Sequence, residues 1–158
     1  MIIAVDIGST KTIVACLDKS GKILEKTKFE TPKQAGEWLE LIQATIASSF
    51  SNYKFNKIIV GVPGIVKNNR IHWCSNLGDD WIGLDIANLL SKDFKVDVLL
   101  ENDANLAGIA ETTTLPKEYD NVIYLNIGAG IGSGFIIKGK LIPGLLNTEA
   151  GLTMIEYD

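Results

Sequence analysis

The feature that most constrains this sequence is a pattern of strand, glycine turn and strand that occurs twice. Ala4–Lys11 reads Ala-Val-Asp-Ile-Gly-Ser-Thr-Lys, and Gly128–Phe135 reads Gly-Ala-Gly-Ile-Gly-Ser-Gly-Phe. Each turn follows a β-branched run, at Met1–Ile7 and Asn121–Ile127, and leads into a second apolar run. Glycine in a tight turn lets backbone N–H groups approach an anion closely. Two such turns facing each other are therefore expected to hold the phosphates of a nucleotide.

Asp6 precedes the first of these glycines and has a predicted role of its own. A carboxylate cannot bind phosphate directly, but it can hold a hydrated Mg²⁺ that does. The simpler alternatives are an ordinary hairpin at Asp6–Thr10 and a flexible loop at Gly128–Gly134. Neither stretch is a P-loop, because no Gly-Lys-Ser/Thr closes it. Neither is a dinucleotide fingerprint, because each turn leads into a strand and not into a helix.

Composition narrows the class of protein. The chain has 158 residues, of which 46% are hydrophobic and 22% charged, enough for an ordinary globular domain with a core. No apolar run approaches the length of a membrane helix and no basic leader precedes the first strand, so we expect a cytoplasmic protein without membrane contact. The net charge of −4 and a single arginine, Arg70, argue against a nucleic-acid partner. Cys16 and Cys74 fit no metal-binding spacing and are predicted to be buried and unpaired.

The rest of the pattern predicts an α/β domain. Ile23–Phe29 alternates as a third strand, and the apolar runs Lys57–Val62 and Val96–Leu100 indicate buried strands. A helix is expected to begin with Thr31 as its N-cap and Pro32 in its first position. Further elements are predicted at Ile71–Trp73 (strand), Asp85–Phe94 (helix) and Asn102–Thr112 (helix).

Three antiparallel strands followed by alternating helices and strands indicate a mixed sheet. At Asn121 the opening hairpin begins again, and the sequence stops before a second unit is complete. We therefore assign residues 1–120 to one domain and residues 121–158 to the opening of a second, similar domain. A hairpin with about twenty further residues cannot bury a core of its own. Exposed strands and a homo-oligomer are the expected consequence.

Motifs spread over nearly the whole chain resemble those of the ROK family, which groups bacterial sugar kinases and sugar-responsive repressors. They are Asp6-Ile-Gly-Ser-Thr-Lys11, Val62-Pro-Gly-Ile65, Asn76-Leu77 with Trp81-Ile-Gly83, Glu101-Asn-Asp-Ala-Asn105, Glu111, and Gly128-Ala-Gly-Ile-Gly-Ser-Gly134. The resemblance implies a ribonuclease-H-like (actin-like ATPase) domain, with Mg-ATP and a sugar held between two such domains. The family's zinc-binding cysteine cluster lies beyond the stretch that matches, so no zinc site is expected within this chain.

Asp103 is the candidate catalytic base. It follows the Val96–Leu100 strand at the first turn of a helix, where open α/β sheets bind ligands and the helix dipole favours an ionised carboxylate. Spacing alone favours a simple helix cap, whereas the resemblance implies the base that accepts the proton of a sugar hydroxyl. Asn102 has the same two interpretations, as a cap or as a hydrogen-bond partner of the sugar.

Further site residues are implied by the resemblance. Gly64 and Asn76 line the sugar cleft in the family, although each is also an ordinary turn residue. Trp81 is more simply a semi-buried loop residue than a wall of the sugar site, and His72 is given no role. The resemblance implies that phosphates and metal are held by Asp6, Gly8, Ser9, Thr10, Lys11, Gly128, Gly130, Gly132, Ser133 and Gly134.

The stretch Glu149-Ala-Gly-Leu152 falls near the Glu-x-Gly-His sugar-binding motif of the family. Glu149 and Gly151 match, which makes Glu149 a candidate sugar ligand, whereas Leu152 replaces the histidine. An alternative alignment places Ala150-Gly151 on the preceding Ala-Gly pair of the family and loses the glutamate as well. The departure bears on sugar specificity and on activity.

Three functions follow as hypotheses. The first is an ATP-dependent kinase acting on a hexose or amino-sugar hydroxyl, and the second is a non-catalytic regulatory or inactive relative that binds sugar or nucleotide. The third is an actin-like module that binds nucleotide for assembly. Asn102-Asp103 and Asn76-Leu77 favour the first two, and Leu152 favours the second over the first. The sequence opens on a strand at Met1 and not on a helix-turn-helix, which disfavours a DNA-binding role.

Overall fold

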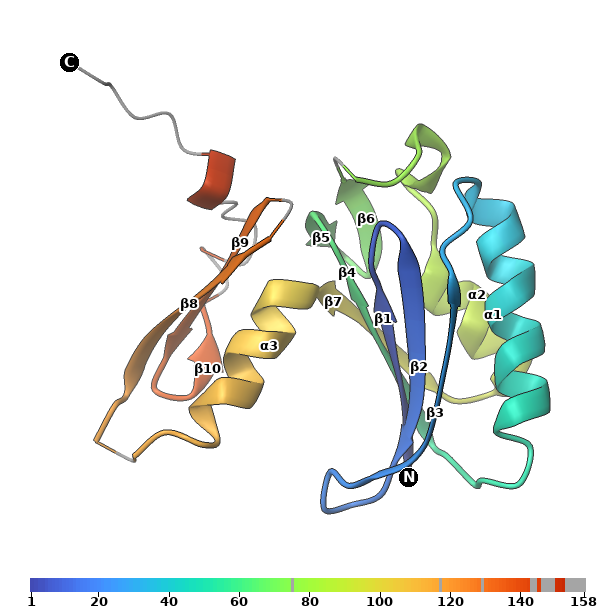
Figure 1. The fold of residues 1–158 in the computed structure, drawn as a ribbon, viewed down its shortest axis with the longest axis horizontal. Coiled ribbons are helices and arrows are strands. Elements are labelled where there is room, and N and C mark those ends of the chain that lie inside the picture. Colours follow the sequence, from blue (N-terminus) through green and yellow to red (C-terminus); the bar gives the residue numbers. More distant parts are fainter. Residues whose placement is uncertain (75, 117, 129, 143–144, 146–149, 153–158) are drawn as a thin grey trace. The chain divides into compact units, whose positions relative to one another are not determined.

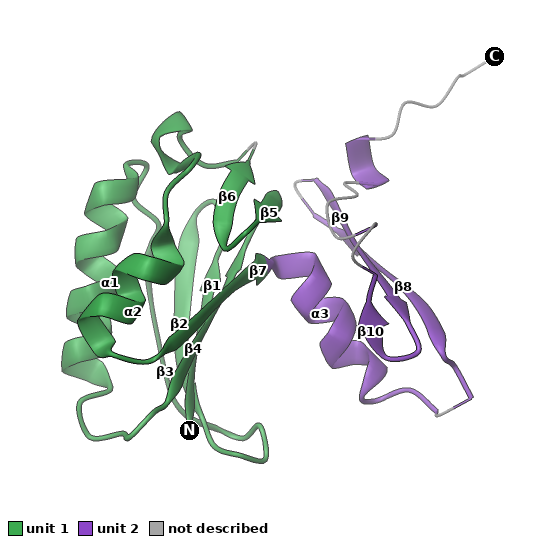
Figure 2. Cartoon of the chain, turned by 180° about the vertical axis from the view of Figure 1, so that it is seen from behind, with its two compact units in different colours: residues 1–101 green, residues 102–158 purple. Residues whose placement is uncertain are grey.

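The computed structural model describes residues 1–74, 76–116, 118–128, 130–142, 145 and 150–152. The chain forms two compact units, residues 1–101 and residues 102–158, which Figure 2 shows in different colours. Each unit is described here by itself. The first holds a five-stranded sheet with two α-helices, and the second holds one α-helix with a three-stranded sheet.

The sheet of unit 1 is mixed, as the sequence predicts (Figure 1). Its strands are β1 (Ile2–Ile7), β2 (Lys11–Leu17), β3 (Ile23–Glu30), β4 (Lys57–Val62) and β7 (Asp97–Asn102), in the order β3-β2-β1-β4-β7. β1 runs antiparallel to β2 and parallel to β4, with Asp6 opposite Ile13 on one side and Gly61 on the other. The parallel pairing brings the carboxyl ends of β1 and β4 to the same edge of the sheet.

The core of unit 1 lies on the sheet face that α1 (Ala35–Ser49) and α2 (Ile86–Phe94) cover (Figure 1). Ile3, Val5 and Ile7 alternate along β1 into this core, because successive side chains of a strand point to opposite faces. Asp6 is exposed on the other face. The strand therefore buries its apolar side chains while its one carboxylate faces water.

The first turn of α1 differs from the prediction. The helix begins at Ala35 and not at Pro32, and its N-cap residue Gln34 makes no side-chain capping bond. Instead the backbone N–H of Ala35 donates to Asp80 Oδ2 at 2.7 Å. The hydroxyl of Thr31 donates to Gly8 O at 2.8 Å. The predicted cap was wrong: the Thr31 side chain binds the β1–β2 turn, and the first N–H of the helix is bound by Asp80, which is distant in the sequence.

A short hairpin, β5 (Ile65–Lys67) and β6 (Arg70–Trp73), follows β4. The sequence predicts only its second strand. Asn68 and Asn69 connect the two strands with φ values of 54° and 57°, as a two-residue turn requires and as asparagine tolerates. Asn69 Oδ1 also accepts a hydrogen bond from Leu100 N, which fastens the turn to β7.

Unit 2 consists of α3 (Asp103–Thr112), β8 (Asn121–Ile127), β9 (Ile131–Ile137), β10 (Lys140–Leu141) and a short 3₁₀ helix, η2 (Ala150–Leu152). β8 and β9 form the second predicted hairpin, with Ile127 opposite Ile131. α3 packs on one face of this sheet. On the other face Ile123 is 65% exposed and Ile127 is 78% exposed. The two units divide after Glu101, and the predicted domains 1–120 and 121–158 stay a prediction.

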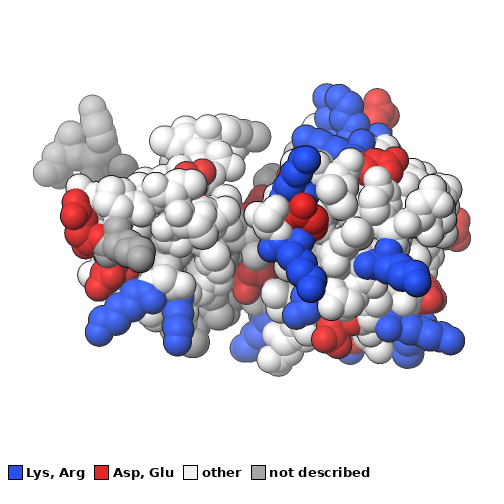
Figure 3. Space-filling model, turned by 90° about the horizontal axis from the view of Figure 1, so that it is seen from below, with Lys and Arg blue, Asp and Glu red and all other residues white. Residues whose placement is uncertain are grey.

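Charged side chains of both signs are interspersed over unit 1 on the face that Figure 3 shows. In the part of the chain that the structure describes, none of the helices has the length and apolar character needed to cross a membrane.

Candidate functional site

The carboxyl edge of the unit 1 sheet brings several predicted site residues together. Asp6 lies near the end of β1, and the β1–β2 turn runs from Gly8 to Thr10. Gly64 follows the end of β4, which is the parallel neighbour of β1. Ser9, Thr10 and Lys11 are exposed, as is Asp6. This edge therefore presents the Asp6 carboxylate, the Lys11 ammonium and an exposed turn backbone to the same end of the sheet.

The β1–β2 turn is closed by hydrogen bonds that the sequence does not reveal. Gly8 N donates to Lys11 O at 2.9 Å, so the Gly8 N–H is used inside the turn. Thr31 N donates to Thr10 O at 3.0 Å, and the Thr31 hydroxyl donates to Gly8 O at 2.8 Å. Thr31 thus holds two carbonyl groups of the turn. Sequence reasoning missed this role because it assigned Thr31 to the start of a helix.

Gly64 is required by its backbone and by its surroundings. Its φ is +94°, and a Cβ at this position would lie 2.2 Å from Trp73 O and 2.8 Å from Cys74 Cα. Gly64 therefore packs directly on the chain that leads from β6 into the exposed Asn76. The structure brings these two predicted sugar ligands into neighbouring segments.

Trp81 is fully buried and does not form the wall of a cleft. Its ring packs against that of Trp38, with 5.3 Å between ring centroids. Its Nε1–H donates to Lys33 O at 2.9 Å, which satisfies its polar atom. The ring belongs to the core of unit 1 and is more deeply buried than the sequence suggests.

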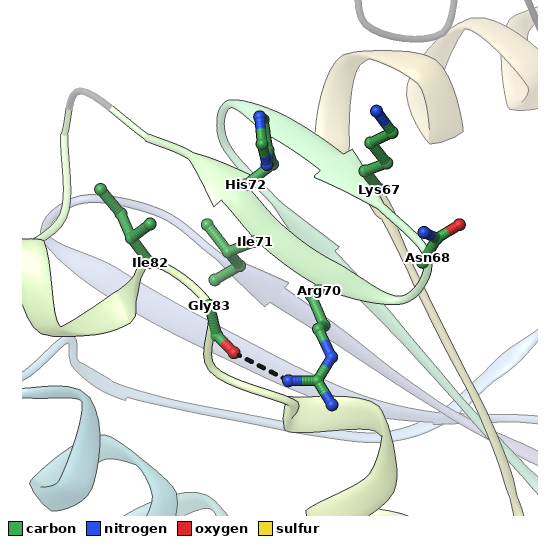
Figure 4. Close-up of a pocket in the computed structure, with 7 residues that line it drawn as sticks. All are labelled: Lys67, Asn68, Arg70, Ile71, His72, Ile82 and Gly83. Carbon is green, nitrogen blue, oxygen red and sulfur yellow. Dashed lines mark hydrogen bonds between the residues drawn. The ribbon is translucent and has the colours of Figure 1, made fainter.

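A recess beside the β5–β6 hairpin is lined by Lys67, Asn68, Arg70, Ile71, His72, Ile82 and Gly83 (Figure 4). Arg70 turns away from Lys67 and His72 in this view, and its guanidinium donates to Gly83 O at 3.3 Å. The same group forms an ion pair with Asp85 at 2.5 Å. The charge of Arg70 is therefore compensated by Asp85, and we assign no catalytic role to the residues that line the recess.

In unit 2 the junction of β7 and α3 carries Asn102 and Asp103. Asn102 is the N-cap of α3, and its Oδ1 accepts from Asn105 N at 2.9 Å. Capping is therefore an observed role of Asn102, and Asp103 occupies the first helical position and not the cap. Asp103 Oδ1 accepts from Ala104 N at 2.8 Å.

The electrostatics of Asp103 differ from the expectation based on the helix dipole. Burial raises the pKa of the Asp103 carboxyl above its ordinary value, and hydrogen bonds from the backbone N–H groups of Ala104 and Asp103 offset the rise only in part. Desolvation disfavours the charged form of an acid, and here it outweighs the stabilisation of that form. A raised pKa makes this carboxylate a better proton acceptor.

Packing explains only some of the glycines in and before β9. Gly132 and Gly134 lie inside β9, where a Cβ on Gly134 would come within 2.8 Å of Ala104 O and one on Gly132 within 3.1 Å of Ala104 Cβ. These glycines let α3 approach the sheet. Gly128 and Gly130 flank the turn itself, and no described heavy atom lies within 4 Å of a Cβ built on either. Packing therefore accounts for the first pair only.

Ser133 faces away from α3. It is 5% exposed, and its Oγ accepts a hydrogen bond from Ala150 N at 3.2 Å. This contact fastens η2, which includes Leu152, to β9. Glu149 itself lies outside the described residues, whereas Leu152 is 63% exposed. Among the described residues no group of three His, Cys, Asp or Glu side chains could bind a metal ion.

Comparison with known proteins identifies the family of this chain. A model of the ROK family matches residues 2–158. The chain belongs to the ROK family. A fructokinase from Streptococcus mutans is 31% identical over 155 residues, which cover 94% of this chain and 51% of the fructokinase.

Solved structures of ROK sugar kinases share the fold. A glucokinase from Streptomyces griseus, in complex with glucose and AMPPNP, superposes with a TM-score of 0.82 at 29% identity, covering 98% of this chain and 50% of that one. An inorganic polyphosphate/ATP-glucomannokinase from Arthrobacter sp. strain KM superposes with a TM-score of 0.84 at 31% identity. The match covers 98% of this chain and 64% of the glucomannokinase chain. The chain spans about half the length of the curated relatives that it matches, such as 51% of the fructokinase. The predicted family and its actin-like ATPase fold are thereby confirmed.

Proposed function

We propose that this ROK chain contributes the sugar-facing base and part of the phosphate site of an ATP-dependent kinase acting on a hexose or amino sugar. The observation that carries the proposal is Asp103. It stands at a strand-to-helix junction, is half-buried, and has a pKa that burial raises. A carboxylate in such a place can accept the proton of an attacking sugar hydroxyl.

Four further residues are proposed as sugar ligands. Asn102 caps α3 through its Oδ1, and its side-chain amide is proposed as a sugar ligand as well. Gly64, Asn76 and Glu149 complete the proposed sugar ligands. Gly64 acts through its backbone, because no side chain fits at its position. Orientation of the hydroxyl toward Asp103 is the main contribution of these residues.

The phosphates would be held by the two glycine turns. In the first turn we assign the contacts to the N–H groups of Ser9 and Thr10 and to the ammonium of Lys11, because Gly8 N–H is engaged by Lys11 O. In the second turn Gly128 N–H is likewise engaged, by Gly130 O at 2.8 Å, so we assign the backbone contact to Gly130 and leave Gly128 the role of shaping the turn. Packing requires no glycine at either position. The remaining predicted ligands, Gly132, Ser133 and Gly134, would support this turn from β9.

The donor chemistry of Asp6 fits a magnesium ion. Mg²⁺ prefers oxygen ligands, keeps several of its waters, and in kinases is held by one or two carboxylates together with phosphate. Asp6 is an exposed carboxylate at the same sheet edge as the first turn. A hydrated Mg²⁺ bound there would supply charge neutralisation to the phosphates.

The test is a coupled assay of ADP release over a panel of hexoses and amino sugars, on this chain and on any longer form of the protein. Sugar-dependent ADP release is the expected result for a form that includes both halves of the ROK fold. A regulatory relative is the second candidate, because Leu152 stands where the family has a histidine. Sugar binding without ADP release in the longer form would support that candidate and overturn the kinase.

A further inference from the structure

A directed chain of hydrogen bonds runs behind the β1–β2 turn of unit 1. Trp38 Nε1 donates to Thr12 Oγ1 at 3.0 Å, and Thr12 Oγ1 lies 2.9 Å from Thr31 Oγ1. Thr31 Oγ1 donates to Gly8 O at 2.8 Å. A hydroxyl has one proton, and that of Thr31 is used on Gly8. Thr12 must therefore donate to Thr31, and the chain runs Trp38, Thr12, Thr31, Gly8.

Burial and cooperativity strengthen this chain. Thr12 and Trp38 are both 0% exposed, and Thr31 is half-buried. Hydrogen bonds in series polarise one another, and they are stronger in a low-dielectric interior than in water. Each hydroxyl accepts one bond and donates one. The final acceptor, Gly8 O, belongs to the turn that faces solvent.

The direction of the Gly8 C=O fixes the direction of the Ser9 N–H in the same peptide group. In a trans peptide the C=O of one residue and the N–H of the next point to opposite sides, and the described chain contains no cis peptide bond. Because Gly8 O points to Thr31, the N–H of Ser9 points away from Thr31. Ser9 is exposed. We call the hydrogen bond from Thr31 Oγ1 to Gly8 O the clamp. The clamp therefore directs the Ser9 N–H outward, at the position where a phosphate is proposed.

We infer that Thr31 is a positioning residue for nucleotide phosphate, acting through Gly8 O to aim the Ser9 N–H. This inference rests on the proposed function, since it takes ATP as the ligand of the turn. Thr31 also holds Thr10 O through its backbone N–H, so its side chain and its main chain grip both arms of the turn. Without the hydroxyl the Gly8–Ser9 peptide plane loses the hydrogen bond that orients it.

The same segment is anchored on its far side. Trp38 packs on Trp81, whose Nε1 donates to Lys33 O, and Asp80 accepts from Ala35 N at 2.7 Å. The chain from Thr31 to Trp38 therefore lies between the turn and the Asp79–Trp81 3₁₀ helix (η1). Rigid anchoring makes the orientation of Gly8 O a fixed property of the fold and not of the turn alone.

The test uses three variants of the whole chain, Thr31→Val, Thr31→Ser and, as a control on the same sheet, Thr27→Val in β3. The first readout needs no ligand: the Gly8 carbonyl ¹³C resonance should move upfield in Thr31→Val, return in Thr31→Ser and stay unchanged in Thr27→Val. An unmoved resonance in Thr31→Val overturns the clamp.

The second readout is a titration with Mg-ATP, followed by the Ser9 amide resonance, with adenosine as a probe that lacks phosphate. Loss of one aimed donor to an anion should weaken ATP binding about tenfold in Thr31→Val. Thr31→Ser should restore it, and adenosine should show no difference between variants. If Thr31→Val binds Mg-ATP as tightly as the wild type does, the inference is wrong and the proposed function still stands. A wild-type Ser9 resonance that Mg-ATP does not move overturns the inference together with the proposed phosphate contact of the first turn, and leaves Thr31 as a structural residue of the fold.

Discussion

Replacing Gly64 with alanine should destabilise unit 1 by more than backbone strain alone. Two costs combine at this position. The φ of +94° lies in a region that alanine rarely adopts, and the new methyl group would lie 2.2 Å from Trp73 O and 2.8 Å from Cys74 Cα. These neighbours are backbone atoms next to a strand of the hairpin, so they cannot rotate out of the way.

The chain offers a matched control for the strain. Gly21 has a φ of +84°, and no heavy atom lies within 4 Å of its Cβ position. Gly21→Ala should therefore cost only the left-handed conformation, about 1–2 kcal/mol. Gly64→Ala adds the overpacking penalty, typically about 1–3 kcal/mol. The difference between the two variants is the quantity that tests the packing.

The assay is urea unfolding followed by tryptophan fluorescence. Trp38, Trp73 and Trp81 are the only tryptophans of the sequence, and all lie in unit 1. The fluorescence transition thus reports the unit that carries both glycines. Equal free energies of unfolding for Gly64→Ala and Gly21→Ala would refute the contact between Gly64 and the Trp73–Cys74 backbone.

Three further outcomes are expected. Gly134→Ala should destabilise unit 2 by about 1–3 kcal/mol in thermal unfolding followed by circular dichroism, because its methyl group would meet Ala104 O at 2.8 Å, whereas Gly130→Ala should have little effect; equal effects would contradict the packing assignment. The folded pKa of Asp103 is raised above 3.8, so the native state holds its proton to higher pH than the unfolded state. The free energy of unfolding should therefore fall as pH rises from 3.8 through the folded pKa, and Asp103→Asn should remove that fall; an unchanged pH profile in the variant would count against it. Ile127 is 78% exposed on the apolar face of β8, so self-association in light scattering should decrease in Ile127→Lys, and a wild-type chain that stays monomeric at high concentration would contradict the predicted oligomer.

Local signals predicted most of the elements. The β1–β2 hairpin, α2 and the β8–β9 hairpin all have side-chain periods and turn residues that act within a few positions. The family resemblance was carried by the same stretches. Such features are predictable because the interactions that fix them are short in sequence.

Long-range contacts account for the differences. The start of α1 depends on Asp80, which lies 45 residues from Ala35. The burial of Trp81 depends on Trp38, and the clamp on the turn joins Thr31 to Gly8. No local pattern records these pairs. In the candidate site the sequence likewise grouped four glycines together, although the position of α3 explains Gly132 and Gly134 and not Gly128 and Gly130.

The measurement that tests the central claim most directly compares wild type with Asp103→Asn in a form of the protein that includes both halves of the ROK fold. Sugar-dependent ADP formation and sugar affinity are measured side by side. If Asp103 is the base, the variant loses about 10²–10⁴-fold in turnover while its sugar affinity stays nearly intact. A variant that keeps more than about a tenth of the wild-type turnover would show that another group accepts the proton and that the proposed role of Asp103 is wrong.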